Sequence, residues 1–146
     1  MKKNFYSLGL MSGTSMDGID ASIIYSNGVD NLKIIENNYY KYDDDLINNL
    51  SDFKNKINSP NDLKLYQKDL KNLERKITVL HGEFSNNIIK KVKEDVDLIG
   101  FHGQTIYHNP DEKISKQLGD GRLLSQLIKK KIVFNFREND IKNNGN

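Results

Sequence analysis

The longest regular pattern in the sequence is a stripe of apolar residues between Leu63 and Val92. Its members recur every three or four positions, which places them on one face of a helix of about nine turns. Such a helix needs a sheet or a partner helix to cover the apolar face. A coiled coil is the alternative, but the stripe is short and lies among strand patterns. The stripe consists of Leu63, Tyr66, Leu70, Leu73, Ile77, Leu80, Phe84, Ile88 and Val92.

Capping residues predict where the helices begin. Ser59 followed by Pro60 suits the start of the long helix. The acids at 43–45 precede a shorter apolar pattern, and their charge favours a helix N-terminus over a metal site. His81 and Gly82 interrupt the long stripe. A partly exposed histidine beside a small packing residue is favoured there over a ligand.

Three strand patterns come before these helices. They cover Phe5–Met11, Ile19–Ser26 and Leu32–Tyr42, and each is rich in β-branched or aromatic residues. Asp17-Gly18 and Asn27-Gly28 separate them and are typical turn dipeptides. The first 42 residues therefore predict an antiparallel meander.

The second half continues with a buried strand at Asp97–Phe101, a helix at Gly119–Lys131 and a strand at Ile132–Phe136. Lysines 129–131 suit the negative end of that helix better than a phosphate site. The order βββααβαβ predicts an α/β domain with a mixed sheet and an antiparallel start.

Composition narrows the functional classes. The 146 residues suit one domain, and the absence of cysteine excludes disulfides, thiol nucleophiles and Cys-liganded metals. Nineteen Lys against three Arg are scattered among acids, so no nucleic-acid footprint is present. No apolar run reaches the length of a membrane span, and no signal sequence is visible. We expect a cytoplasmic protein without a membrane partner.

The segment GLMSGTSMDGID at 9–20 is the densest candidate for chemistry. Glycines let backbone N–H groups approach an anion, hydroxyls add donors, and a carboxylate can hold hydrated Mg²⁺ beside phosphates. The segment matches neither the P-loop nor the dinucleotide fingerprint, because it links two strands. A polar hairpin turning at Asp17-Gly18 is the alternative to a phosphate loop.

Two further clusters offer hydrogen-bonding groups for sugar hydroxyls. HGQT at 102–105 follows a predicted strand, and QLGDG at 117–121 precedes a predicted helix. Asp120 fits a helix cap as well as a ligand. Arg137 and Asp140 also suit a surface ion pair, and the histidines lack a third metal ligand at a recognisable spacing. The sugar-contact candidates are His102, Gln104, Thr105, Asp120 and Arg137.

Four segments resemble the anhydro-N-acetylmuramic acid kinase family, which belongs to the actin-like sugar kinases. They are GLMSGTSMDGID at 9–20, GFHGQTIYHNP at 100–110, QLGDG at 117–121 and FR-x-x-DI at 136–141. The resemblance implies that residues 1–146 are an incomplete, ribonuclease-H-like, actin-like ATPase lobe, the N-terminal one of two. It also implies that the phosphates of ATP lie on Gly13, Thr14, Ser15, Met16, Asp17, Gly18, Ile19 and Asp20.

The family converts 1,6-anhydro-N-acetylmuramate to N-acetylmuramate 6-phosphate with ATP, in the recycling of peptidoglycan. The resemblance implies that Asp17 serves Mg²⁺ through water and that the full-length protein is able to form a homodimer. It places the catalytic base in a D-T-G-P-G-N-type motif beyond Asn146, so we expect no catalytic residue here and an inactive isolated chain. A non-catalytic sugar- or phosphate-binding module and another kinase of the superfamily are the alternatives.

Overall fold

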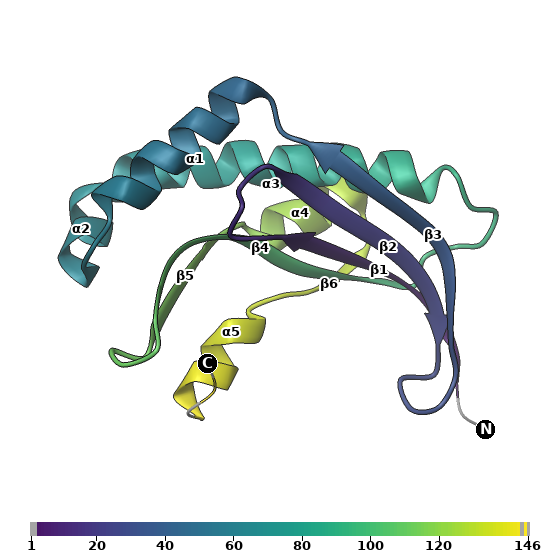
Figure 1. Ribbon diagram of the computed structural model, residues 1–146. Coiled ribbons are helices and arrows are strands. Elements are labelled where there is room, and N and C mark those ends of the chain that lie inside the picture. Colours follow the sequence, from purple (N-terminus) through teal and green to yellow (C-terminus); the bar gives the residue numbers. More distant parts are fainter. Residues whose placement is uncertain (1–2, 144, 146) are drawn as a thin grey trace.

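The computed structural model describes residues 3–143 and residue 145, and its strands form one mixed sheet of six (Figure 1). The strands are β1 (Phe5–Ser12), β2 (Gly18–Ser26), β3 (Leu32–Lys41), β4 (Leu98–Asn109), β5 (Ile114–Leu118) and β6 (Lys131–Val133). The first three form the expected antiparallel meander. β4 lies parallel to β1, and β6 lies parallel to β4. The α/β prediction is confirmed, and the open sheet is consistent with part of an actin-like lobe.

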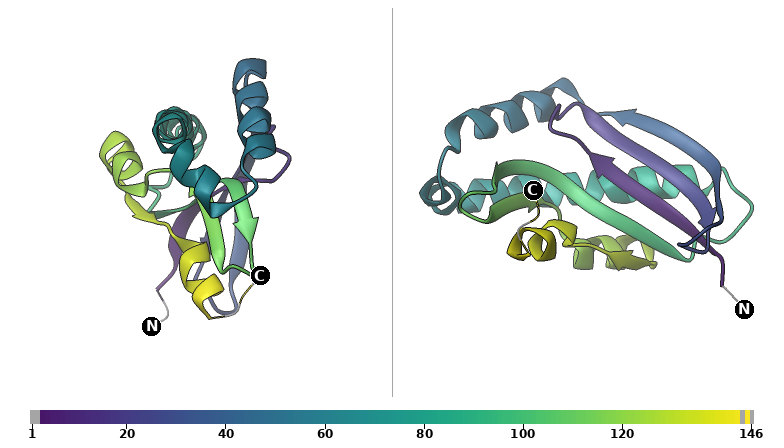
Figure 2. Two further views of the ribbon diagram at one scale, coloured as in Figure 1. Left: turned by 90° about the vertical axis from the view of Figure 1, so that its left-hand side faces the viewer. Right: turned by 60° about the horizontal axis from the view of Figure 1, so that its bottom comes forward.

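Five helices accompany the sheet in the part of the chain that is described. They are α1 (Asp44–Lys56), α2 (Pro60–Leu65), α3 (Gln67–Ile89), α4 (Gly121–Ile128) and α5 (Phe136–Lys142). Figures 1 and 2 show α1, α3 and α4 over one face, whereas α5 lies against the other. None of the helices within residues 3–143 is both long and apolar enough to cross a bilayer.

The core lies between the sheet and the helices on its covered face. Leu8 and Leu10 of β1 point into it and are buried, whereas Met11 is exposed on the opposite face. Leu50 of α1 and Ile77 of α3 pack into the same core and are fully buried. Each such side chain contributes about 1.5–3 kcal/mol by leaving water. The opposite face of the sheet carries Met11 and is not covered by these helices.

Both predicted helix starts are confirmed. The Asp43 carboxylate accepts the Leu46 N–H at 2.7 Å, and the Ser59 hydroxyl caps α2 with Pro60 at its first turn. The single long helix is wrong, because the chain leaves helical geometry at Tyr66, with φ −95° and ψ 13°. The Tyr66 ring packs edge-on against Phe53 of α1 there. α3 then ends at Ile89, one turn before the predicted end.

The strand predicted to end at Phe101 instead continues to Asn109. The HGQT segment therefore lies within β4 and not beyond it. The extension is stabilised by β5, whose weakly alternating sequence was not recognised as a strand. Gly103 sits in this extension with φ +75°, and a Cβ there would lie 2.7 Å from the Leu118 carbonyl oxygen. Only glycine fits that position.

The last elements are shorter than predicted. α4 ends at Ile128 because Lys129 adopts the left-handed conformation, although Lys129 and Lys130 still follow its negative end. The strand predicted at Ile132–Phe136 is present, but β6 ends at Val133 and so stops three residues early. Asn135, with φ 63°, turns the chain into α5.

Candidate functional site

The hairpin between β1 and β2 holds the predicted phosphate loop. Its turn is closed by a 3.2 Å hydrogen bond from the Met16 N–H to the Gly13 carbonyl oxygen. Met16 takes a left-handed conformation while its side chain is buried. The turn at Asp17-Gly18 is therefore wrong, and Gly18 belongs to β2. Gly18 is instead needed for packing, because a Cβ there would lie 2.4 Å from the Tyr40 carbonyl oxygen.

The exposed side of this hairpin carries polar side chains. Thr14, Ser15 and Asp17 are exposed. The Ser15 hydroxyl donates to Asp17 Oδ1 at 2.5 Å. This bond, followed by one from Tyr39, holds the pKa of Asp17 below its usual value. Asp17 therefore presents a negative charge to solvent at neutral pH.

Three contacts fix the hairpin to the rest of the fold. The Gln104 side-chain amide donates to the Gly13 carbonyl oxygen at 2.7 Å, and Gln104 is fully buried. The Tyr42 N–H donates to the Asp17 carbonyl oxygen at 2.8 Å. Lys54 of α1 reaches the Thr14 carbonyl oxygen at 3.3 Å. The residue that follows β3, together with β4 and α1, thus holds one short loop.

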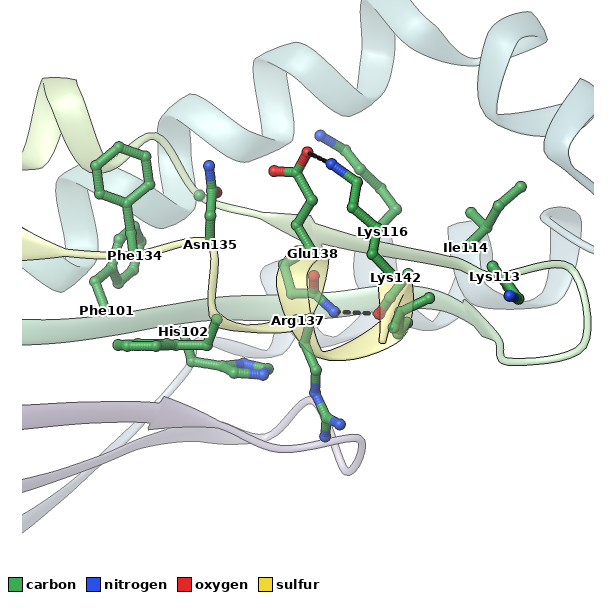
Figure 3. Close-up of a pocket in the computed structure, with 15 residues that line it drawn as sticks. Phe101, His102, Lys113, Ile114, Lys116, Phe134, Asn135, Arg137, Glu138 and Lys142 are labelled. Carbon is green, nitrogen blue, oxygen red and sulfur yellow. Dashed lines mark hydrogen bonds and ion pairs between the residues drawn. The ribbon is translucent and has the colours of Figure 1, made fainter. Parts of the chain in front are cut away.

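A pocket of about 700 Å³ opens beside the hairpin on the open face of the sheet. Asp20 of β2, His102 of β4 and Arg137 of α5 line it together. A second pocket of about 380 Å³ lies between β4, β5 and α5 and shares His102 and Arg137 (Figure 3). The two pockets therefore adjoin at His102 and Arg137, and residues from three separate motifs line the larger one.

All of these motifs lie in a stretch that one family of proteins shares. A sequence model of the family described as anhydro-N-acetylmuramic acid kinase matches residues 5–146. The chain belongs to this family. It is 57% identical over 145 residues to the anhydro-N-acetylmuramic acid kinase of Pelagibacter ubique. It is 34% identical over 142 residues to that of Agrobacterium fabrum.

The chain spans about two-fifths of the length of these relatives. The alignment with the Pelagibacter kinase covers 99% of this chain and 39% of the relative. The corresponding shares for the Agrobacterium kinase are 95% and 38%. The resemblance to part of an anhydro-N-acetylmuramic acid kinase is thus confirmed.

Not every sugar-contact candidate lines the two pockets that contain His102. Gln104 lies beneath the hairpin, and Thr105 and Asp120 line neither pocket that contains His102. The Thr105 hydroxyl accepts from the Gln117 amide at 3.4 Å. Asp120 caps α4 by accepting two backbone N–H groups at 2.9 Å. The expected ion pair between Arg137 and Asp140 is present at 3.8 Å.

Replacing Asp120 with alanine should lower the free energy of unfolding by about 1 kcal/mol, because two N–H groups of α4 lose their acceptor. Serine, which also caps helices, should restore most of that loss. Urea unfolding of the two variants measures the difference. Equal stability of all three proteins would contradict the capping role.

Within residues 3–143 and 145, no three His, Cys, Asp or Glu side chains gather closely enough to hold a metal ion. Asp17 directly follows the turn that Met16 and Gly13 close, and the bonds from Ser15 and Tyr39 lower its pKa further below neutral pH. A carboxylate of this kind suits Mg²⁺ that keeps most of its water ligands. The single carboxylate of Asp17 is therefore of a kind that fits a water-mediated magnesium contact.

Sequence reasoning missed a polar cluster beneath the hairpin. His81 was expected to be partly exposed, but it is fully buried on the core side of α3. His81 lies four residues after Ile77, on the same face of the helix as the apolar stripe, so its burial could have been predicted from the sequence. Its ring contacts Phe101 edge-on and bonds to Ser12 of β1. A buried polar ring of this kind needs such partners.

Lowering the pH from 7 to 5 should lower the free energy of unfolding by about 2 kcal/mol because of His81. Burial lowers the pKa of His81 from 6.5 to about 4. Below pH 6.5 His81 is therefore protonated in the unfolded chain, whereas in the folded chain it stays neutral until about pH 4. Stability is full above pH 6.5 and declines through this window. Urea unfolding at both pH values measures the loss, and His81→Gln should abolish it; an equal loss in both proteins would contradict this origin.

Proposed function

We propose that residues 1–146 form the N-terminal lobe of a kinase that phosphorylates 1,6-anhydro-N-acetylmuramate with ATP. One observation carries the proposal: the family's phosphate-loop segment adjoins a pocket in which Asp20, His102 and Arg137 meet. The product is N-acetylmuramate 6-phosphate, an intermediate of peptidoglycan recycling. The proposed use of ATP and of a recycled sugar supports a cytoplasmic location.

The phosphate-binding role is proposed for the whole segment from Gly13 to Asp20. The exposed Thr14 and Ser15 offer hydroxyl donors, and the turn offers backbone N–H groups. Met16 and Ile19 are buried, so they shape the backbone and do not touch the nucleotide themselves. Gly18 lets β3 approach the hairpin closely.

Asp17 is proposed to hold Mg²⁺ through water. When bound, the ion supplies positive charge to the transferring phosphoryl group. The chain's own part is to orient the Asp17 carboxylate through the hydroxyls of Ser15 and Tyr39, and to fix its carbonyl oxygen through the Tyr42 N–H.

The sugar is proposed to occupy the junction of the two pockets. His102 offers a ring nitrogen and Arg137 a guanidinium, both suited to sugar hydroxyls and carboxylates. Figure 3 shows the two side chains on the same side of β4. Gln104, which bonds to Gly13, is proposed to act through the loop. Thr105 and Asp120 are more distant candidates, and Asp120 already serves α4.

The proposed reaction couples two bond changes. Water attacks the anomeric carbon and loses a proton to a base, and the bond from that carbon to O6 breaks. O6 then takes the γ-phosphoryl group, and the bond to the β-phosphate breaks to release ADP. This chain supplies the phosphate loop and sugar pocket, and the remaining three-fifths of the protein supplies the base.

Sugar-dependent release of ADP tests the proposal. The complete polypeptide that contains this chain should release ADP only when 1,6-anhydro-N-acetylmuramate is present, and the 146-residue chain alone should not. Sugar binding by the complete polypeptide without any ADP release would contradict the proposal and indicate a binding module instead.

A further inference from the structure

A row of buried hydrogen bonds runs beneath the hairpin, from the residue after β3 to α3. Ser12 Oγ lies 3.0 Å from the Tyr42 hydroxyl and 2.9 Å from His81 Nε2. Ser12, Tyr42 and His81 are at most 3% exposed, although each carries a polar group. Such a cluster is stable only when its hydrogen bonds are satisfied.

The Ile77 carbonyl oxygen determines which atom donates in each of these hydrogen bonds. His81 Nδ1 lies 2.8 Å from the Ile77 carbonyl oxygen, which cannot donate, so Nδ1 carries the ring proton. Nε2 is then the acceptor for the Ser12 hydroxyl. Ser12 in turn accepts from the Tyr42 hydroxyl. The two hydroxyls and the Nδ1–H of His81 therefore each donate one hydrogen bond, and Nε2 of His81 accepts one.

Two members of the cluster are also joined to the ends of the loop. Ser12 directly precedes Gly13, and the Tyr42 N–H holds the Asp17 carbonyl oxygen at 2.8 Å. His81 lies on the central turns of α3, the longest helix among the described residues. The helix thus provides a fixed point from which the loop between Gly13 and Asp17 is held.

We propose, on the basis of the kinase function proposed above, that His81 is a positioning residue for the phosphate loop. It acts through Ser12 and does not touch the nucleotide. Loss of its acceptor frees Ser12 to rotate and loosens the hairpin. The loop then spends less time in the geometry that binds phosphates.

Three variants of the complete polypeptide separate positioning from general stability. His81→Leu keeps bulk and removes the acceptor, whereas His81→Gln keeps an acceptor near the position of Nε2. Ser85→Ala is the matched control, because Ser85 is fully buried one turn further along α3 and donates to the His81 carbonyl oxygen at 2.6 Å. Ser85 bonds within the helix and not to the loop.

Amide hydrogen exchange without nucleotide is the first measurement. The Met16 and Tyr42 amides, which donate within and below the loop, should exchange about tenfold faster in His81→Leu. They should change by less than about threefold in His81→Gln and Ser85→Ala. The Tyr25 amide, near the end of β2 that is remote from the loop, is the reference for exchange away from the hairpin. Equal acceleration at Tyr25, or none at Met16 and Tyr42, would overturn the proposal.

Steady-state kinetics supply the second measurement. His81→Leu should raise KM for ATP about tenfold and leave KM for the sugar within about twofold. Adding Ser12→Ala to it should cost less than Ser12→Ala costs alone, because the bond between Ser12 and His81 is already broken and only the bond from Tyr42 is still lost. Additive losses would overturn the proposal. An inactive wild type would contradict the kinase function alone, since the exchange result decides loop positioning without catalysis.

Discussion

Replacing Asp17 with alanine should lower turnover of the complete polypeptide by about 100-fold or more, because charge on the transferring phosphoryl group loses its carboxylate-held counterion. The side chain is exposed, so folding should be unaffected. Initial rates measured over a range of Mg²⁺ concentrations give the effect. Saturation with Mg²⁺ should recover part of the lost rate.

The matched control is Asp111→Ala, which removes an exposed carboxylate from the connection between β4 and β5. Its turnover should stay within about twofold of the wild type. Unchanged turnover of Asp17→Ala with an intact fold would remove Asp17 from the magnesium and phosphate site. Asp17→Asn, which keeps the shape without the charge, should resemble the alanine variant.

Replacing Gly18 with alanine should lower the free energy of unfolding by about 2–3 kcal/mol. The added Cβ would lie 2.4 Å from the Tyr40 carbonyl oxygen and 2.7 Å from the Tyr39 ring. The contact is with backbone, so β3 must move away from the hairpin. Because Tyr39 also bonds to Asp17, activity should fall with stability.

Gly9→Ala is the control for the loss of stability expected in Gly18→Ala. Gly9 lies in the neighbouring strand, and a Cβ there would have no neighbour closer than the Ser22 carbonyl oxygen at 3.9 Å. Urea unfolding should show little change for Gly9→Ala. Equal stability of the two variants would contradict the close packing of β2 and β3.

Local chemistry explains the parts of the fold that were predictable. Asp43 and Ser59 cap helices wherever their side chains reach an N–H two or three residues on, and that preference depends on few neighbours. The meander was readable because Asn27-Gly28 turns the chain without help, with Gly28 at φ 72°. The phosphate-binding role of residues 13–20 stays a prediction, which rests on their density of Gly, Ser and Asp and on the family resemblance.

Tertiary contacts explain the parts that were not predictable. Met16 buries its side chain, and this moved the turn away from Asp17-Gly18. The second half of β4 exists because β5 pairs with it, although neither sequence is strongly apolar. His81 looked like an interruption of the helix, because its partner Ser12 is 69 positions away. The pocket joining Asp20, His102 and Arg137 needed three elements in place.

The most direct test of the kinase assignment is the identity of the product. The complete polypeptide should convert 1,6-anhydro-N-acetylmuramate and ATP to a sugar heavier by one water and one phosphoryl group, with one ADP formed per sugar. Mass spectrometry and phosphorus NMR should place the phosphate on O6 and show the anhydro bridge open. A sugar that keeps its bridge, or ADP formed without any sugar product, would contradict the account.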